Sequence, residues 1–160
     1  AQFFRREIQA FRNSAERAIS LNPMDGFTTA YLGSLVAYAG EWERGSALIQ
    51  RARKLNPHHP GWYWFATCFD AYNKKDYRGA LEFALKVNMP GFWRTSMALA
   101  TIYGQLGETE KARDAVRGLL ATRPDFGVVG RVELGKWWDA ELVERIVEGL
   151  RKAGLEMAGG

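Results

Sequence analysis

Hydrophobic residues recur every three or four positions along most of this chain, and this period is typical of amphipathic α-helices. The first such stretch covers residues 2–21, where arginines stand between the apolar positions. Its apolar face consists of Phe4, Ile8, Phe11, Ala15 and Ala18. Asn22-Pro23 follows and ends the helix, because proline disfavours helical geometry in the residue before it. The pattern therefore predicts one helix over residues 2–21.

Prolines mark the end of each helical stretch at a nearly constant interval. Pro23, Pro57, Pro90 and Pro124 follow one another at spacings of 34, 33 and 34 residues. A period in this range is typical of α-solenoids, whose repeats are pairs of antiparallel helices. We therefore expect an all-α fold, a right-handed α-solenoid with C-terminal capping helices. The expected units are residues 1–25 (the second helix of a truncated repeat), 26–59, 60–90 (an irregular unit), 91–125 and 126–160 (capping helices and tail).

The unit over residues 26–59 shows the repeat pattern most clearly. We expect its first helix over residues 26–39, with Asp25 as the N-cap, and its second over residues 41–55. A glycine inside a helix costs roughly 1 kcal/mol relative to alanine. Gly33 and Gly45 are therefore expected at a close crossing of the two helices. The apolar seam of the first helix is expected at Tyr31, Leu32, Leu35 and Val36.

The unit over residues 60–90 departs from this pattern. In the neighbouring units Gly40 and Gly107 end the first helix, where glycine readily takes the left-handed conformation. Lys75 stands at that position here, so we expect Asn73 to adopt the left-handed conformation instead. The unit is also expected to be slightly misoriented relative to ideal stacking.

The pattern changes after the fourth proline. A helix over residues 126–138 is weakened by glycines, and Asp139 is the expected N-cap of a strongly amphipathic helix. A solenoid needs a terminal cap because its last repeat otherwise exposes a core edge, and we assign residues 126–155 this role. We expect one of Trp137 and Trp138 to pack beneath the cap while its neighbour faces elsewhere. The last five residues are expected to fray.

Composition and charge narrow the class of protein. The chain has 160 residues, no apolar run long enough for a membrane span and no leader-like apolar segment at its start. It begins with Ala inside a helical pattern, so we expect it to be part of a longer protein. A single cysteine, Cys68, suits a reducing, cytoplasmic compartment. The net charge of +4 lies in residues 1–80, which hold 11 Lys/Arg and 7 Asp/Glu, and this excess hints at an acidic partner.

No motif in the chain predicts catalysis. His58-His59 are adjacent in a turn and have no further ligand-type residue at a metal-binding spacing, so a surface turn explains them better than a metal site. Cys68 has no second cysteine and no base at a suitable spacing, and we expect it to be a small packed residue. We therefore expect no enzymatic activity, no metal and no cofactor in this chain.

Two units carry the signature residues of a known family. In the unit over residues 26–59 these are Leu32-Gly33, Val36, Gly45, Ile49, Ala52 and Pro57. In the unit over residues 91–125 they are Leu99-Ala100, Tyr103, Gly107, Ala112, Val116 and Pro124. In spacing and residue type these units resemble the tetratricopeptide repeat (TPR) family, over about residues 1–125. The resemblance implies a protein–protein interaction scaffold that binds a peptide or partner segment in a concave groove.

Matching the chain to the TPR frame places the groove on the first helix of each unit. The groove-facing residues that this implies are Phe27, Ser34, Tyr38, Trp62, Phe65, Phe69, Tyr72, Arg94, Met97, Thr101 and Gln105. Aromatic residues and arginine are enriched among the residues that dominate binding energies. The spacing leaves open whether the aromatic residues from Trp62 to Phe69 face the groove or the core.

A second, narrower resemblance concerns residues 88–126 and the later segments KWW and ELVERIVEGLRKAGL. These resemble C-terminal TPR regions of bacterial multidomain signalling proteins, including class III adenylate/guanylate cyclases. The resemblance implies a regulatory C-terminal part of a larger signalling protein, and no cyclase residue is present to carry a catalytic role.

Two other functions stay open, while no membrane partner is expected. One is self-association as a homodimer. The other is binding of an acidic ligand or nucleic acid by basic residues of the first half, for which salt-sensitive binding would be expected. These residues are Arg5, Arg6, Arg51, Arg53, Lys54, Lys74, Lys75 and Arg78.

Overall fold

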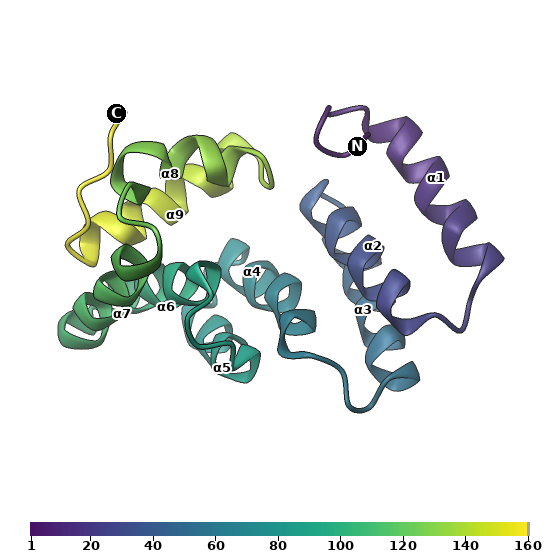
Figure 1. Cartoon of the computed structure of the whole chain (residues 1–160), viewed down its shortest axis with the longest axis horizontal. Helices are drawn as coiled ribbons and strands as arrows, with labels where there is room; N and C mark the ends of the chain where they lie inside the picture. The colour runs from purple at the N-terminus through teal and green to yellow at the C-terminus, as the bar shows by residue number, and fades with distance from the viewer. Residues whose placement is uncertain (160) are drawn as a thin grey trace.

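The structure is a computed structural model that describes residues 1–159, and over that range it contains only helices. In chain order these are α1 (Ile8–Leu21), α2 (Gly26–Tyr38), α3 (Trp42–Leu55), the 3₁₀ helix η1 (Gly61–Trp64), α4 (Phe65–Asn73), α5 (Tyr77–Val87), α6 (Trp93–Leu106), α7 (Thr109–Thr122), α8 (Phe126–Gly135) and α9 (Ala140–Lys152). The pairs α2/α3, α4/α5 and α6/α7 pack as hairpins that follow one another through the molecule (Figure 1). The expected all-α solenoid is confirmed.

The hairpin of α2 and α3 is the most closely packed of these pairs. A Cβ placed on Gly33 would lie 2.8 Å from the Cβ of Leu48, and one on Gly45 would lie 2.5 Å from the Cβ of Ala37. Both distances are below normal contact, so the two glycines allow the helices to cross as the sequence predicts. Asp25 caps α2 by accepting a hydrogen bond of 3.0 Å from the Thr28 N–H.

The first helix is shorter than its hydrophobic pattern predicts, because α1 begins at Ile8 and not at residue 2. Residues before it form turns, and Arg6 adopts a positive φ of 59°. These turns bring Phe3 into the core, where it is 1% exposed and meets the ring of Phe11 at 5.6 Å. The extra burial of Phe3 explains why the helix is not continued toward the N-terminus.

The third unit differs from its neighbours at its first helix. Its first helix starts as a 3₁₀ turn, Gly61–Trp64, and α4 then has only nine residues. Lys75 itself takes the left-handed conformation, with φ of 62°, so the assignment of that role to Asn73 is wrong. Asn73 stays in α4, where its backbone and side-chain oxygens both accept hydrogen bonds from Arg145. An exposed lysine can take this conformation because the Lys75 N–H bonds the Tyr72 carbonyl and closes the helix end.

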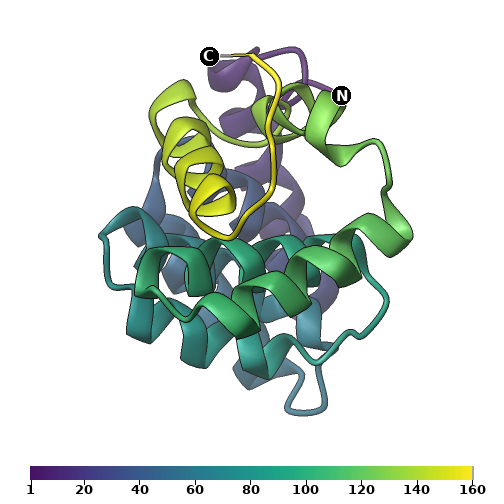
Figure 2. The ribbon, with the colours of Figure 1, turned by 90° about the vertical axis from the view of Figure 1, so that its left-hand side faces the viewer.

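The C-terminal helices do not simply extend the stack. After α8, Asp139 caps α9 by accepting a hydrogen bond from the Leu142 N–H at 2.9 Å. The chain then turns back, so that α9 lies across the layer formed by the preceding hairpins and packs on α6 (Figure 2). The buried face of α9 consists of Leu142, Val143, Ile146, Val147, Gly149 and Leu150. The cap is therefore seated on the first-helix side of the solenoid.

The two adjacent tryptophans before α9 differ in burial, but both contact Tyr38. Trp138 is 1% exposed and packs between Tyr38 of α2 and Phe69 of α4, at ring distances of 5.4 and 4.3 Å. Trp137 is half-buried, and its ring also meets that of Tyr38, at 6.4 Å, and that of Phe4, at 5.0 Å. The loop between α8 and α9 thus bridges the two ends of the solenoid.

The expected fraying of the C-terminal tail is wrong for residues 156–159. Met157 is 7% exposed, and the Ala158 N–H donates a hydrogen bond of 2.8 Å to the Gly127 carbonyl. The tail gains this order because it covers α8, whose glycines leave room for it. Gly160 lies outside the described residues.

Buried apolar side chains form one main cluster that extends from Phe3 to Met157, so all the units share a core. None of the helices described is both long and apolar enough to cross a membrane.

Candidate partner-binding pocket

The groove residues expected from the TPR frame fall into two sets, and the first set is covered by the C-terminal region, mainly α9 and the loop before it. This set consists of Phe69, Tyr72, Met97, Thr101 and Gln105. All but Gln105 are buried, and Phe69 meets Trp138 in place of a ligand. The residues do lie on the concave side of α4 and α6, but their expected place in an open groove must be corrected. The chain's own C-terminal region occupies that part of the groove.

Polar groups fix α9 in this position. Tyr72 donates a hydrogen bond to the Arg145 carbonyl and Thr101 donates one to the Ile146 carbonyl, each at 2.8 Å. The Gln105 side-chain amide donates to the same Arg145 carbonyl at 3.2 Å. Burial raises the pKa of Tyr72 to about 12, so the hydroxyl stays protonated and able to donate. The polar side chains that the sequence assigns to the groove therefore already have hydrogen-bond partners within the chain.

Two glycines bring α9 close to α6. A Cβ on Gly104 would overlap the carbonyl oxygen of Gly149, and a Cβ on Gly149 would lie 2.6 Å from the Thr101 carbonyl oxygen. Because neither position has room for a side chain, the helix backbones approach closely enough for the Thr101 hydroxyl to reach α9. Sequence spacing alone gives no signal for this pair, since the two glycines are far apart in the chain.

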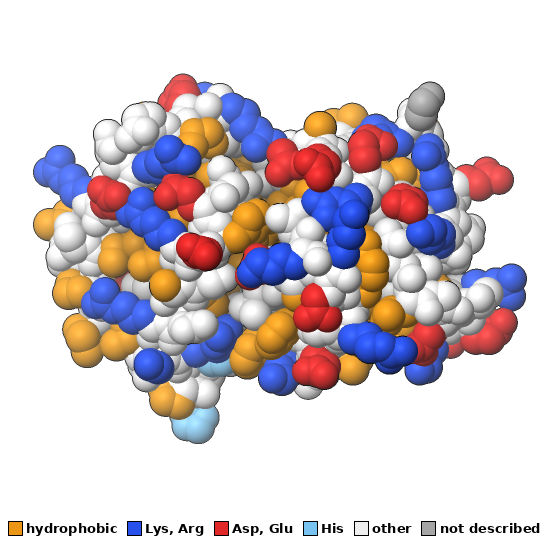
Figure 3. Space-filling view, turned by 180° about the vertical axis from the view of Figure 1, so that it is seen from behind, with side chains coloured by type: hydrophobic (Ala, Val, Ile, Leu, Met, Phe, Trp, Pro, Cys, Tyr) orange, Lys and Arg blue, Asp and Glu red, His pale blue; other side chains and the backbone are white. Residues whose placement is uncertain are grey.

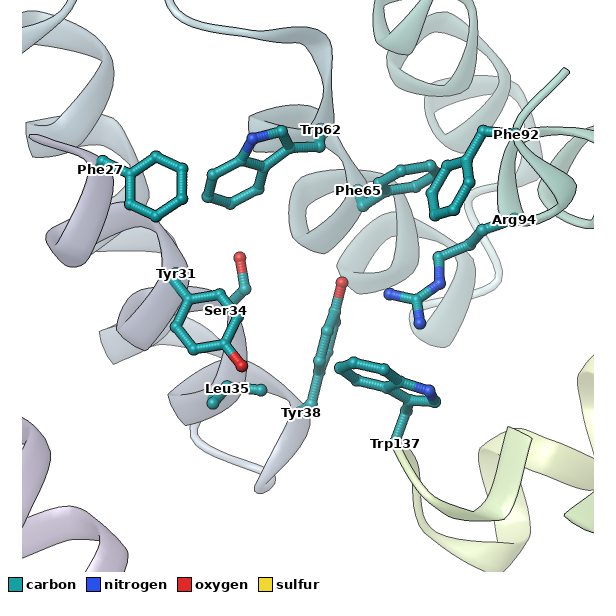
Figure 4. A pocket seen from close by; sticks show the side chains of 10 residues that line it. All are labelled: Phe27, Tyr31, Ser34, Leu35, Tyr38, Trp62, Phe65, Phe92, Arg94 and Trp137. Atoms are coloured by element: carbon teal, nitrogen blue, oxygen red, sulfur yellow. The ribbon is translucent and has the colours of Figure 1, made fainter. Parts of the chain in front are cut away.

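The second set of predicted groove residues surrounds a pocket that stays open. Its members are Phe27, Ser34, Tyr38, Trp62, Phe65 and Arg94. They come together with four residues that the groove prediction missed, Tyr31, Leu35, Phe92 and Trp137. Figure 4 shows their side chains around a cavity of about 200 Å³ between α2, the start of the third unit, the start of α6 and the α8–α9 loop.

The pocket has an exposed end and a buried end. At the exposed end Phe27 is 60% and Tyr31 44% exposed, and Phe27 meets Trp62 edge-on at a ring distance of 5.4 Å. Deeper in the cavity Tyr38 and Phe65 are buried. Large apolar groups at the rim of a concave apolar site are available to a partner.

Arg94 provides the only cationic side chain among the residues that line the pocket. Its guanidinium carbon lies 4.0 Å from the centre of the Trp137 ring and 6.0 Å from that of Phe65. Burial lowers the pKa of Arg94, while the nearby Tyr38 and Tyr31 oppose that shift. The cation is therefore partly shielded from water and lies against aromatic faces.

The wall that carries Trp137 is held by the N-terminal turn. Arg6 donates hydrogen bonds to the carbonyls of Gly135 and Trp138, at 2.5 and 3.1 Å. Phe4 also packs edge-on against Trp137, with ring centres 5.0 Å apart. The residues before α1 thus hold in place the loop that carries Trp137.

Some of the pocket residues that the groove prediction missed could have been found from the sequence. Tyr31 and Leu35 were assigned to the seam between helices, but both line the cavity, and Tyr31 is exposed. Tyr31 lies one helical turn after Phe27, a spacing that could have indicated a shared face. Trp137 depends on where α9 folds, which no local pattern gives.

Cys68 and His59, both candidates for catalysis or metal binding, have packing contacts instead. Cys68 is fully buried, and burial raises the pKa of its thiol to about 12, which does not suit a nucleophile. His59 stacks on Tyr63 at 4.9 Å. Over residues 1–159, no group of three or more His, Cys, Asp or Glu side chains is placed to hold a metal ion.

Several basic residues of the first half have partners within the chain. Lys74 pairs with Asp70 at 2.9 Å, Arg5 pairs with Glu7 at 3.3 Å, and Arg53 lies over the Trp64 ring at 4.1 Å. On the face in Figure 3, cationic and acidic side chains are interspersed. That face has no separate basic surface of the kind that nucleic-acid binding requires.

Comparison with known proteins supports the architecture. The sequence matches no protein-family model. No curated protein matches it either. Among solved structures, the crystal structure of MamA superposes with a TM-score of 0.61 over 92% of this chain and 89% of that chain, at 16% sequence identity. At this identity the likeness concerns the fold, and it supports the conclusion that the chain has a TPR-like helical-repeat fold.

Proposed function

We propose that this chain is a protein–protein interaction scaffold whose open pocket receives an apolar side chain from a segment of a partner protein. The observation that carries the proposal is the aromatic cavity left open where α9 fills the rest of the groove. Full burial of a Leu or Phe side chain contributes roughly 1.5–3 kcal/mol. One anchor of this kind, surrounded by aromatic rims, is typical of the residues that dominate an interface.

The size of the cavity favours a side chain over a complete small molecule. Pockets for drug-sized ligands are typically about 300–1,000 Å³, whereas this cavity measures about 200 Å³. The partner's backbone would then lie outside the cavity, along the rim formed by Phe27, Tyr31 and Trp62. Because α9 covers the adjacent concave surface, the contact is expected to be short.

A peptide selection tests the proposal. Short random peptides are displayed, selected on the folded chain, and measured individually by calorimetry. The double variant Phe27→Ala/Tyr31→Ala should lose binding while keeping its helical content, because neither side chain is buried in the core. The matched control is Leu85→Ala, which removes a side chain that is 58% exposed on α5, outside the pocket. Selected peptides that bind the double variant and the wild type equally would contradict the proposal.

The prediction of a signalling role rests on the resemblance of part of the sequence to C-terminal TPR regions of cyclases. A role as the regulatory C-terminal part of a bacterial, cytoplasmic signalling protein of the cyclase type is supported by residues 88–126 and the KWW segment. The sequence that precedes Ala1 in the gene tests it directly, because a class III cyclase domain should be encoded there. Self-association stays a prediction for sedimentation analysis, and nucleic-acid binding stays one for titration at low salt.

A further inference from the structure

We propose that the partner segment carries an acidic side chain beside its apolar anchor, and that Arg94 is the counter-ion for this carboxylate. The inference rests on the proposed function and specifies the chemistry of the partner. It follows from the position of one charged residue at the inner end of an otherwise apolar cavity.

Arg94 is only partly exposed to water and has no acidic partner in the described part of the chain. Within residues 1–159 no carboxylate forms an ion pair with it, and its buried Nε atom has no hydrogen-bond partner. Arg94 and Arg123 both lie over the Trp93 ring, at 5.4 and 5.5 Å, but Arg123 pairs with Asp125 at 3.4 Å. A partly desolvated cation without a counter-ion is unfavourable, and a ligand that supplies a carboxylate removes part of that cost.

The aromatic contacts of Arg94 leave its hydrogen-bond donors available. The guanidinium lies against the face of Trp137 at 4.0 Å, and its terminal nitrogens point toward Tyr38 and the cavity (Figure 4). A stacked guanidinium keeps its N–H groups in its own plane, where two of them can bind one carboxylate. The site therefore offers a shape that a carboxylate fits and an apolar group does not.

An acidic side chain fits this position better than a chain terminus. A terminal carboxylate would bring its own backbone amide into the cavity, where the hydroxyls of Tyr31, Ser34 and Tyr38 are the only acceptors among the lining side chains. A buried amide without a partner is unfavourable. The side chain of Asp or Glu brings only methylene groups with its carboxylate. A neighbouring apolar residue of the same segment would then occupy the rim at Phe27 and Trp62.

The test uses peptides obtained by the selection above and synthesised with acetylated N-termini and amidated C-termini. Each peptide is compared with its own Glu→Gln or Asp→Asn version on the wild-type chain by calorimetry. We expect the neutral version to bind about 10- to 100-fold more weakly, as is typical for a hydrogen bond to a charged group. On the Arg94→Gln variant, the acidic and neutral versions should bind alike.

Two control variants distinguish the loss of the Arg94 charge from the loss of any positive charge nearby. Arg123→Gln removes a nearby charge that already has a partner, and it should leave the preference for the acidic peptide unchanged. Arg94→Lys keeps the charge but loses the planar pair of donors, so it should keep part of the preference. Should Arg94→Gln fail to fold, as judged by circular dichroism, the comparison of the two peptides on the wild-type chain still decides.

The outcomes distinguish this inference from the proposed function. Peptides that need Phe27 and Tyr31 but bind equally well with and without their acidic residue overturn the role of Arg94 and leave the scaffold function standing. Peptides that bind only with a free C-terminal carboxylate also overturn the inference. Selection of no peptide that depends on the pocket residues overturns both proposals.

Discussion

The Arg94 guanidinium carbon lies 4.0 Å from the centre of the Trp137 ring. This contact joins the first turn of α6 to the loop between α8 and α9. This contact holds the cation at the inner end of the pocket and fixes one wall of the cavity. The C-terminal region thus has two roles in the same fold. It fills part of the concave surface and shapes the part that remains.

The first prediction concerns that contact. Replacing Trp137 with alanine removes both a cation–π partner and half-buried apolar area, so the free energy of unfolding should fall by about 1–3 kcal/mol. Trp137→Phe keeps an aromatic face and should cost less. Urea unfolding followed by circular dichroism measures both. Equal stability of the alanine variant and the wild type would show that the contact contributes nothing.

The second prediction concerns the hydrogen bonds that hold α9. Tyr72→Phe removes the donor to the Arg145 carbonyl and should lower the free energy of unfolding by about 1–2 kcal/mol. Hydrogen exchange of the α9 amides should also become faster. Tyr103→Phe, on α6 and half-buried, removes a hydroxyl that makes no hydrogen bond within residues 1–159, and it serves as the control. Equal effects of the two variants would argue against the Tyr72 bond.

The third prediction concerns the crossing of α6 and α9. Gly149→Ala places a Cβ 2.6 Å from the Thr101 carbonyl oxygen, so it should destabilise the chain by about 1–3 kcal/mol through overpacking. Gly135→Ala is the matched control, because a Cβ there meets nothing within 4 Å. Thermal unfolding of the two variants should differ clearly. A Gly149→Ala chain as stable as the control would mean that α9 does not pack on α6 as described.

The fourth prediction concerns alkaline pH. The unfolded thiol of Cys68 loses its proton near the ordinary pKa of 9.0, whereas burial raises the pKa of the folded thiol to about 12. Between these values the folded state binds more protons, so the free energy of unfolding falls as pH rises, by about 1.4 kcal/mol per pH unit for this group. Urea unfolding between pH 9 and 10 should therefore show a shallower loss of stability in Cys68→Ala.

The same burial predicts the reactivity of the thiol. In the native chain at pH 8, Cys68 should react with a thiol reagent only as fast as the chain opens, and it should react at once in urea. Rapid labelling without unfolding would contradict the buried position.

Local signals in the sequence were sufficient for much of the fold. Asp25 and Asp139 cap the helices expected of them, and Gly33 with Gly45 marks a close crossing. These features depend on a few neighbouring residues, so spacing and residue type reveal them. Lys75 was not foreseen, because its positive φ follows from bonds that close the end of α4.

The candidate site was less predictable, because it depends on where α9 comes to rest. The amphipathic pattern of α9 shows that one face is buried but not what covers it. Tyr72 and Thr101 therefore appeared as groove positions, although they bond α9. Arg94 and Trp62, which the repeat frame assigns to the groove, line the cavity, whereas Trp137 reaches it only through the fold of the α8–α9 loop.

The central claim is that binding occurs in the pocket beside α9 and not along the whole concave surface. Its most direct test is an NMR titration of the folded chain with a selected acidic peptide, following the indole N–H signals. Trp62 and Trp137 should shift on binding, while Trp64, which stacks on Phe83 away from the pocket, should not. A titration that leaves Trp62 and Trp137 unchanged while the amide signals of α9 shift or disappear would contradict the account.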